Sequence, residues 1–526
     1  MSTTPSTPNR GIVVFSGGSA ANNLVDVFSA LRESKDCFLS YIIPISDNGG
    51  SSSELIRIFG GPGIGDVRSR LVRLIPPSPP NSERAAIKSL FNHRLPTDAS
   101  AHAEWLAIVD GTSTVWKSIT PAKKELIRSF FNLLNLEILK RARPPASTFD
   151  FSSASVGNLF LTGARLFSGS FESAIYILSN ICDVPSDLVR VIPAINSNFS
   201  HHISASLANG TVIVGQNSIS HPSLPPWPTS PSTTPLETET IGAAPIDYTE
   251  PSDVLSTALY EDDQPPGFLP HLRNKNISFS KSDNEDLPAR ITRIWYINPY
   301  GQEIRPRANP RVLESIRDAQ AIIYSIGSLY TSLIPSIVLQ GVGQAIVSSP
   351  ARHKILILNG SLDRETGPAS DPFTAVDFIE AITRAGEESR GRHFLDPANG
   401  SATSPSTTTN PSHNAFPPLR LEINGLALSL PYTSYVTHVL HLDGPGTPSV
   451  DKDRLAEMGI ECLRLYGRKI VSSLPDGTEV PVGMRYDSAG LTQALEMVLG
   501  KKGDAMLRGE GLSRRNTLDP GRKRGA

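Results

Sequence analysis

Residues 46–53 combine an acid, an amide, two glycines and four hydroxyls directly after an apolar run. Glycines allow close backbone approach, Asp47 could hold a hard cation or a ribose, and the serines could donate to phosphate. The same residue types also cluster in ordinary turns. Because open α/β sheets bind ligands where their strands end, we favour a binding site. Its candidate residues are Asp47, Asn48, Gly49, Gly50, Ser51 and Ser52.

Two strand-to-helix turns could bind an anion at a helix N-terminus. The first contains Gly17, Gly18 and Ser19, and the second contains Gly327, Ser328, Thr331 and Ser332. A plain turn and an N-cap role for the threonine are the alternatives. The first turn has neither the GxGxxG spacing of a dinucleotide fold nor the GK[ST] of a P-loop. Two such turns in one sheet favour a nucleotide or a diphosphate.

A second glycine-rich turn is followed by Asp66, Arg68 and Arg70. The aspartate could contact a ligand or could cap the helix that follows. The two arginines could place their guanidinium forks on phosphate oxygens. This turn is therefore a second candidate source of ligand contacts.

Further polar side chains open helices or follow strands elsewhere in the chain. Asn158 opens a helix and could donate to a ligand carbonyl or cap that helix. Asn359 follows a predicted strand, with Glu365 just beyond it. His438 and His441 lie within an apolar strand, where residues three apart face opposite sides. We interpret these histidines as packing residues rather than metal ligands.

Size and composition indicate a globular protein. The chain has 526 residues, 39% hydrophobic and 19% charged, so it can bury a substantial core and could form two or more domains. Its net charge of -2 provides no basic field for nucleic acid. The three cysteines are far apart and odd in number, which favours a reducing compartment. The N-terminal apolar run is too short for a signal peptide or membrane span, so we expect a cytoplasmic protein with no membrane partner.

The α/β rhythm predicts a doubly wound, mostly parallel Rossmann-like sheet with a helical cap and disordered insertions. Strands are expected at 12–15, 38–45, 189–194, 203–207, 211–214, 291–297, 321–326, 354–358, 435–442 and 460–465. Helices are expected at 20–31, 67–75, 83–92, 122–139, 155–168, 171–181, 331–347, 373–385, 451–458 and 488–499. Asn209-Gly210 between two apolar runs predicts a hairpin.

Composition divides the chain into seven segments. They are a disordered leader (1–10), the first part of the α/β domain (11–220) with a helical cap at about 76–145, a disordered Pro/Ser/Thr-rich insertion (221–290), the second part of the domain (291–385), a second disordered insertion (386–418), its final part (419–500) and a basic tail (501–526). The simplest architecture is one α/β domain with interruptions.

Taken in order, Gly17-Gly18, SDNGGSS, GDVR, SVGNL and GSLYTS resemble the 2-phospho-L-lactate transferase (CofD-like) family. They also resemble its sister group, the YvcK-like bacterial gluconeogenesis factors that bind nucleotide sugars. The resemblance covers roughly 11–75, 151–220, 291–385 and 430–499. In gluconeogenesis factors the first loop typically reads DDGGSSG, whereas here Asn48 replaces the second acid.

The resemblance implies a transferase that moves a phosphoester group of the 2-phospho-L-lactate type from a nucleotide diphosphate donor to an alcohol acceptor. In this reaction Asp47 would hold Mg²⁺ or orient the acceptor hydroxyl, glycine-rich amides would take the diphosphate, and Arg68 would neutralise developing charge. The alternative is a regulator of carbon metabolism that binds a nucleotide sugar without turnover. A nucleotide diphosphate or nucleotide sugar is the expected partner in either case, and a homodimer stays open.

Overall fold

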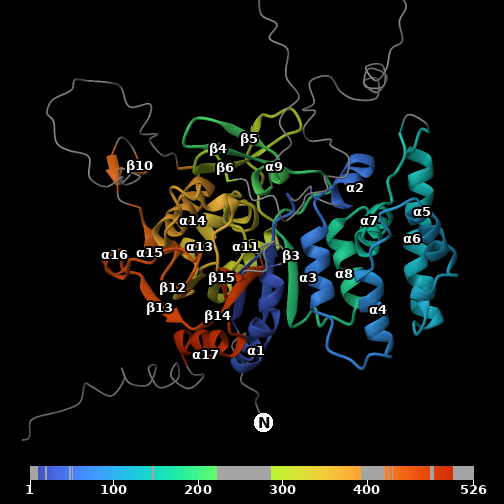
Figure 1. The fold of residues 1–526 in the computed structure, drawn as a ribbon, viewed down its shortest axis with the longest axis horizontal. Coiled ribbons are helices and arrows are strands. Elements are labelled where there is room, and N and C mark those ends of the chain that lie inside the picture. Colours follow the sequence, from blue (N-terminus) through green and yellow to red (C-terminus); the bar gives the residue numbers. More distant parts are fainter. Residues whose placement is uncertain are drawn as a thin grey trace, which may run out of the picture.

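A seven-stranded, all-parallel sheet forms the centre of the molecule (Figure 1). The computed structural model describes residues 10–17, 20–46, 49, 51–144, 147–221, 286–392, 421–423, 426–428, 430–473 and 479–500. In spatial order the strands are β13 (Glu461–Leu465), β12 (His438–Leu442), β9 (His353–Ile357), β8 (Ala319–Tyr324), β1 (Gly11–Phe15), β2 (Leu39–Ile43) and β3 (Val189–Pro193). The predicted doubly wound α/β fold is confirmed.

The strand order reverses between β1 and β8, the two central strands. Strand β1 pairs in parallel with β2 on one side and with β8 on the other. The chain therefore winds outward in opposite directions from these two strands, and the loops after them diverge. A crevice at the carboxyl ends of such strands is where doubly wound sheets bind ligands.

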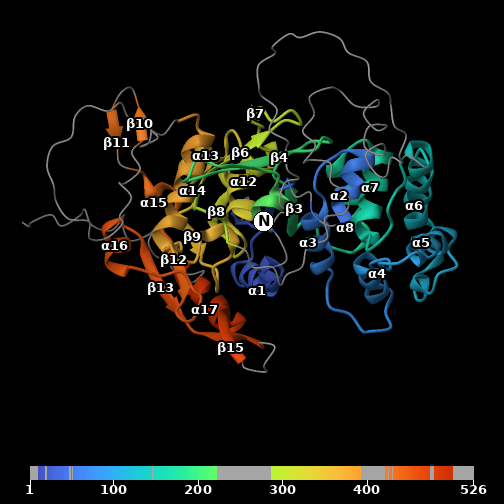
Figure 2. The ribbon, with the colours of Figure 1, turned by 45° about the horizontal axis from the view of Figure 1, so that its top comes forward.

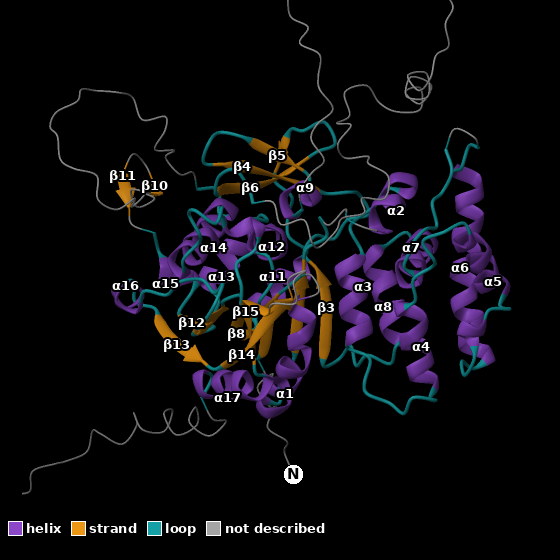
Figure 3. Cartoon of the chain, in the orientation of Figure 1, coloured by secondary structure: helices purple, strands orange, loops and turns teal. Residues whose placement is uncertain are grey.

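The central strands are mostly apolar because helices cover both faces of the sheet. Strand β2, LSYII, is buried at every position, and the last four residues of β1 are buried as well. On one face, α1 (Val25–Lys35) packs against α17 (Ser488–Val498), and on the other, α11 (Pro310–Arg317) packs near β1, β3 and β8. Figure 3 shows these helical layers flanking the sheet.

A helical region extends beyond β3. It comprises α2 (Ser51–Phe59), α3 (Gly65–Arg73), α4 (Glu83–Asn92), α5 (Ser100–Asp110), η2 (Thr114–Trp116), α6 (Pro121–Arg141), α7 (Val156–Ser168) and α8 (Phe171–Ile181). Helices α5 and α6 form its outer layer (Figure 2). Phe160 of α7 packs edge-to-face against Phe130 and Phe131 of α6, which ties this layer to the rest of the protein.

A separate antiparallel sheet lies apart from the central one (Figure 3). Its order is β5 (Val212–Val214), β4 (His202–Leu207), β6 (Ile291–Ile297) and β7 (Glu303–Ile304), and α9 (Gln216–Ser220) follows β5. The predicted Asn209-Gly210 hairpin is confirmed, since β4 and β5 pair around it. The expectation that residues 291–297 form a strand of the α/β domain's parallel sheet is wrong, because β6 pairs antiparallel with β4 in the separate sheet.

Other elements differ from the predicted ones. The single helix expected at 331–347 is three pieces, η4 (Leu329–Leu333), α12 (Ile334–Ile337) and α13 (Val342–Ser348), because Gly341 has φ +95 and interrupts the run. Helix α14 (Ala375–Ser389) runs past residue 385, so residues 386–389 are helical rather than part of an insertion. Helix α2 and the hairpin β14 (Gly467–Ser473)–β15 (Glu479–Tyr486) were not expected.

The remaining described elements are short: η1 (Ala20–Leu24), η5 (Arg364–Thr366), β10 (Leu421–Ile423), β11 (Leu426–Leu428), α15 (Tyr432–Tyr435) and α16 (Lys452–Glu457). The leader at 1–9, most of the two insertions and the tail at 501–526 lie outside the described residues. Among the helices that are described, none has the length and apolar character needed to cross a membrane.

Candidate functional site

Three segments meet at the point where the strand order reverses: the loop after β1, the loop after β8 and the start of α3. A Cβ placed on Gly17, after β1, would lie 3.1 Å from Ser332 Cβ and 3.2 Å from Asp66 Oδ2. A Cβ placed on Gly327, after β8, would lie 3.3 Å from Ser332 Cβ and 3.6 Å from the Gly17 carbonyl oxygen. We call residues 16–17 and 325–333 the switch-point loops. Because these loops have glycine at positions 17 and 327, their backbones come close together, and a side chain at either position would crowd Ser332.

Asn359 lies in the loop after β9. Its side chain binds the backbone of the loop after β8. Its Oδ1 accepts a hydrogen bond from Gly327 N at 3.0 Å, and its Nδ2 donates to Gly327 O at 2.9 Å. Gly327 has φ +145, a conformation that other residues rarely adopt. The structure thus gives the predicted ligand residue Asn359 a positioning role.

A buried glutamate fixes the start of η4. Glu365 Oε2 accepts hydrogen bonds from the backbone nitrogens of Tyr330 at 2.9 Å and Thr331 at 3.0 Å. Its Oε1 accepts from the Thr331 hydroxyl at 2.5 Å. Burial, with the nearby Asp363 carboxyl, raises the pKa of Glu365 to about 8. The Thr331 hydroxyl is therefore engaged within the protein.

Asp363 is a second acid at the same place, and it is partly exposed. Burial raises its pKa, and its carboxylate accepts hydrogen bonds from the side chains of Ser328 and Thr366. Sequence reasoning noted Glu365 but missed Asp363. The sequence pattern that could have revealed Asp363 is a pair of acids, two positions apart, in a loop after a buried strand.

Arg68, Asn158 and Ser52 form a chain of contacts on the β2 side of the switch point. Arg68 Nε donates to Asn158 Oδ1 at 3.2 Å, and Asn158 Nδ2 donates to Ser52 Oγ at 3.5 Å. Burial, and to a smaller degree Arg94, lowers the pKa of Arg68 to about 10, while Asp66 acts in the opposite direction. Three residues that the sequence predicted separately therefore lie together.

Arg70 does not join Arg68 at a ligand. It is 1% exposed, and its Nη1 and Nη2 each donate at 3.2 Å, to Ala21 O and to Ser16 Oγ. Its guanidinium carbon lies 4.5 Å from the centroid of the Tyr41 ring. Arg70 thus stabilises the loop after β1 through these hydrogen bonds. The expectation that its guanidinium binds phosphate oxygens is wrong, because it is buried.

Part of the loop after β2 can be placed. Ser46 Oγ donates to Gln216 Oε1 of α9 at 2.8 Å, and Ser52 N donates to Gly49 O at 3.2 Å at the start of α2. The predicted residues Gly18, Ser19, Asp47, Asn48 and Gly50 lie outside the described residues, as does the side chain of Ser51. The loop therefore ends at a helix N-terminus, which leaves amides available for an anion.

A cavity of about 450 Å³ opens beside the second switch-point loop. It is bounded by η1, the loops after β8 and β9, and the hairpin β14–β15. Its lining residues are Ala20, Asn23, Leu24, Ile326, Gly327, Ser328, Asn359, Gly360, Ser361, Asp363, Ile470, Met484, Arg485, Tyr486 and Ser488. The hairpin wall was not anticipated from the sequence.

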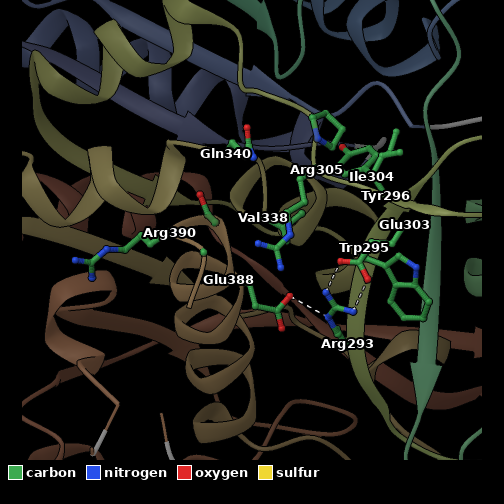
Figure 4. A pocket seen from close by; sticks show the side chains of 13 residues that line it. Arg293, Trp295, Tyr296, Glu303, Ile304, Arg305, Val338, Gln340, Glu388 and Arg390 are labelled. Atoms are coloured by element: carbon green, nitrogen blue, oxygen red, sulfur yellow. Dashed lines mark hydrogen bonds and ion pairs between the residues drawn. The ribbon is translucent and has the colours of Figure 1, made fainter. Parts of the chain in front are cut away.

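A smaller cavity of about 240 Å³ lies at the edge of the antiparallel sheet, between β6, β7 and the end of α14 (Figure 4). Arg293 reaches both Glu303, at 2.7 Å, and Glu388, at 3.1 Å. These carboxylates raise the pKa of Arg293 in spite of its burial, which alone would lower it. Its guanidinium is therefore already paired within the protein.

No group of three or more His, Cys, Asp or Glu side chains with metal-binding geometry occurs among the residues that the structure places. His438 packs beside His353, with ring centroids 5.3 Å apart, and His441 is buried in β12. Because Asp47 is not among the placed residues, Mg²⁺ at this aspartate stays a prediction.

Comparison with known proteins identifies the family. The family model for 2-phospho-L-lactate transferase CofD matches residues 12–406. A Saccharomyces cerevisiae protein, named as uncharacterized protein YNL011C, is 42% identical over 386 residues, which are 71% of this chain and 83% of the yeast protein. The gluconeogenesis factor of Halalkalibacterium halodurans is 23% identical over 373 residues, 71% of this chain and 73% of that protein.

Solved structures agree on the fold. A UPF0052 family member from Bacillus halodurans, solved twice, has TM-scores of 0.50 and 0.51 at 19% identity, over 93% of this chain and 100% of the other. The parallel sheet, the close approach of Gly17 and Ser332 at the switch point and the match to the family model agree with one another. The chain belongs to the CofD family of 2-phospho-L-lactate transferase-like proteins, which its motifs had indicated.

Proposed function

We propose that the protein binds a nucleotide diphosphate or a nucleotide sugar, with its phosphates on the switch-point loops. The observation that supports this most is the approach of Gly17, Gly327 and Ser332 from two diverging loops. Backbone amides at such a place bind anions without needing a lysine. Asn359 and Glu365 hold the second loop in place before any ligand arrives. Preorganisation of this kind lowers the entropic cost of binding.

The cavity beside these loops would take the rest of the ligand. Its volume of about 450 Å³ is within the range of small-molecule sites. Asn23 and Ser361 offer polar groups, while Leu24 and Ile470 offer apolar surface. This mixture suits a sugar or a nucleoside better than an apolar ligand. The curated relatives named gluconeogenesis factors favour a role in carbon metabolism.

Phosphoester transfer is the second candidate function, and a cluster near α7 favours it. Burial and the nearby charge of Arg94 lower the pKa of Arg68, while Asp66 raises it. Asp66 also lies beside the loop after β1, since a Cβ on Gly17 would lie 3.2 Å from its Oδ2. The Ser155 hydroxyl at the start of α7 is buried and has no hydrogen-bond partner among the residues that the structure describes. Two cations beside a helix N-terminus would stabilise charge on a second phosphate or acceptor.

In this reaction the acceptor's hydroxyl oxygen would attack the donor phosphorus, and the bond from that phosphorus to the leaving nucleoside monophosphate would break. The hydroxyl proton would pass to a base, for which Asp47 is our candidate. Arg68 would offset the negative charge that develops on the phosphoryl oxygens. Mg²⁺, when bound, would supply further charge neutralisation.

Calorimetric titration of the purified chain with GDP, GTP, UDP-GlcNAc and UDP-glucose, with and without Mg²⁺, tests the proposal. We expect at least one of them to bind in the micromolar range or tighter. Asp47→Ala separates the two candidates. UDP-sugar binding that ignores metal and survives Asp47→Ala would eliminate the transferase. If no nucleotide binds to the wild-type chain, both candidates fail.

A further inference from the structure

Helix α6 (Pro121–Arg141) lies in the outer helical layer, and one of its sides packs on the rest of the protein (Figure 2). The buried side carries Ile127, Phe130, Phe131, Leu134 and Ile138. These residues recur at spacings of three and four, which places them on one side of a helix. If the opposite side faced only water, it would be expected to carry polar and charged residues.

The opposite side of α6 carries leucines instead. Leu126 is 47% exposed and Leu136 is 49% exposed. Leu133, which is half-buried, lies seven residues after Leu126 and three before Leu136. Residues at these spacings share a face of a helix. We call these three residues the leucine stripe of α6.

Phe167, near the end of α7, adds to this apolar surface. It is 69% exposed, although its ring packs edge-to-face against Phe130 of α6 with the centroids 5.5 Å apart. Single exposed apolar residues are ordinary on protein surfaces, whereas several in a row mark interaction surfaces. The leucine stripe with a phenylalanine beside it therefore favours a protein partner.

The exposed charges at the two ends of α6 are opposite in sign. Near the N-terminal end, the Glu125 side chain is 64% exposed and pairs with Arg128, which is 20% exposed. Near the C-terminal end, Lys140 is 56% exposed and Arg141 is 40% exposed, while their partner Glu137 is 20% exposed. The outward face thus presents a carboxylate at one end and two cations at the other.

The lysines near the N-terminal end of α6 do not cancel this difference, because they are turned to neighbouring segments. The Lys123 ammonium lies 3.6 Å from carboxylate oxygens of both Glu83 and Asp183. Lys124 donates to Gly111 O at 2.8 Å. The charges at the two ends also suit the helix dipole. The dipole does not explain the exposed leucines that lie between them.

We propose that the leucine stripe of α6 binds the same stripe of a second copy of this chain, with the two helices antiparallel. In a two-fold contact each copy uses the same surface, so the surface must be complementary to itself. An antiparallel pair centred between Asn132 and Leu133 meets this condition. Glu125 and Lys140 lie equally far from that centre, so each carboxylate would face a cation of the other copy.

The length of α6 suits such a contact. Its 21 residues span about 31 Å, so the leucines can meet near the middle while both charged ends still overlap. The pairing would bury the exposed leucines and leave the charges at the rim, which is the usual arrangement of an interface. The inference goes beyond the proposed function and does not depend on it.

Sedimentation of the full chain in the analytical ultracentrifuge, over a series of concentrations, tests the dimer. We expect the wild type to dimerise with a dissociation constant in the micromolar range or tighter. Leu136→Glu should raise this constant on the order of 100-fold or more, because the change acts twice in a symmetric dimer. Leu136 is exposed, so the variant should fold normally, which circular dichroism checks.

Met497→Glu is the matched control. Met497 is 65% exposed on α17, so this variant places the same new charge on an exposed apolar position of another helix. It should dimerise like the wild type. A dimer that persists in Leu136→Glu would overturn the inference, because another surface would then hold the two copies together. A wild type that stays monomeric at every concentration would overturn it as well.

Charge reversal tests the antiparallel arrangement. Glu125→Lys and Lys140→Glu should each weaken the dimer on the order of 10-fold, because each puts like charges opposite one another. The double variant restores opposite charges and should recover most of the loss. If the losses of the two single variants added instead, the antiparallel pairing would be wrong. None of these outcomes bears on nucleotide binding, so the proposed function is tested separately.

Discussion

The cavity on the antiparallel sheet and the cavity at the switch point contain similar residue types and differ in how their charges are paired. In the cavity on the antiparallel sheet, Arg293 is held between Glu303 and Glu388. In the cavity at the switch point, the lining acid Asp363 accepts hydrogen bonds from Ser328 and Thr366, and Arg485 also lines the space. The density of charged residues therefore does not mark the site. The site is marked instead by its position at the carboxyl ends of the strands and by a lining arginine that has no ion pair with the described residues.

The sharpest way to break this comparison is to substitute a glycine in each cavity. Gly327 has φ +145 and Gly391 has φ +79, so valine strains the backbone at both. At Gly327 the added Cβ also meets Ser332 Cβ at 3.3 Å, whereas nothing lies within 4 Å at Gly391. We expect Gly327→Val to lower nucleotide affinity on the order of 100-fold or more, through loss of amide contacts to phosphate.

Calorimetry of both variants, with circular dichroism to confirm folding, checks this expectation. Gly391→Val should bind within about twofold of the wild type, because its cost lies in backbone strain alone. If Gly391→Val lost as much affinity as Gly327→Val, the assignment of the ligand to the switch-point cavity would be wrong.

Arginine-to-alanine substitutions give the next largest contrast. Arg68→Ala should reduce nucleotide affinity or turnover on the order of 10-fold, because a cation near the phosphates is lost. Arg293→Ala should leave affinity unchanged and lower the free energy of unfolding by about 1–3 kcal/mol, since Glu303 and Glu388 lose their shared partner.

Chemical denaturation and titration of the two variants separate these effects. The reverse pattern, in which Arg293→Ala abolishes binding and Arg68→Ala only destabilises, would contradict the assignment of the site.

The pH dependence of stability tests the buried acid of the switch point. Glu365 has a pKa of about 8 in the folded protein against an ordinary value of 4.5. Between these values the folded state keeps a proton that the unfolded state has released, so stability falls as pH rises through this window. Its contribution to the slope is at most about 1.4 kcal/mol per pH unit. Denaturation midpoints at several pH values measure it.

Glu365→Gln is the matched control, because its amide oxygen can still accept the hydrogen bonds from Tyr330 N and Thr331 N. This variant should lose part of the downward slope between pH 4.5 and pH 8. An unchanged slope would show that Glu365 does not titrate in this window.

The smallest expected effect comes from Arg305, the counterpart of Arg485. Both are exposed arginines that line a cavity, and neither makes a hydrogen bond or ion pair with the residues whose placement is described. Arg305→Ala should change affinity less than about twofold and stability by less than about 0.5 kcal/mol. Competitive binding at matched concentrations would reveal a larger change, which would give the second cavity a ligand of its own.

Local patterns predicted the elements of the central sheet well. Strand β1 and the second halves of β8 and β9 are apolar because both faces of the sheet are covered, and this pattern is visible in the sequence. The glycine loops after β1 and β8 were correctly placed at strand ends for the same reason. The predicted site residues Gly17, Asp66, Gly327 and Ser332 meet because parallel strands present their carboxyl ends at one edge.

What the sequence did not predict depends on contacts between distant residues. Strand β6 looks like any buried strand, and only its pairing with β4 places it in another sheet. Arg70 differs from Arg68 by two positions on α3, yet it faces Tyr41 rather than the site. Arg485 reaches the cavity because Gly360, which is far from it in the sequence, has no side chain and lets the backbone of β15 come close. No local pattern reports such an approach.

Hydrogen–deuterium exchange with and without a saturating nucleotide diphosphate tests the central claim most directly. We predict slower exchange in the amides of residues 20–24, 325–333 and 479–486, which surround the switch-point cavity. Residues 293–306 and 388–391, around the second cavity, should exchange at the same rate in both states. Protection confined to the second cavity, with no change at the switch-point loops, would contradict the account.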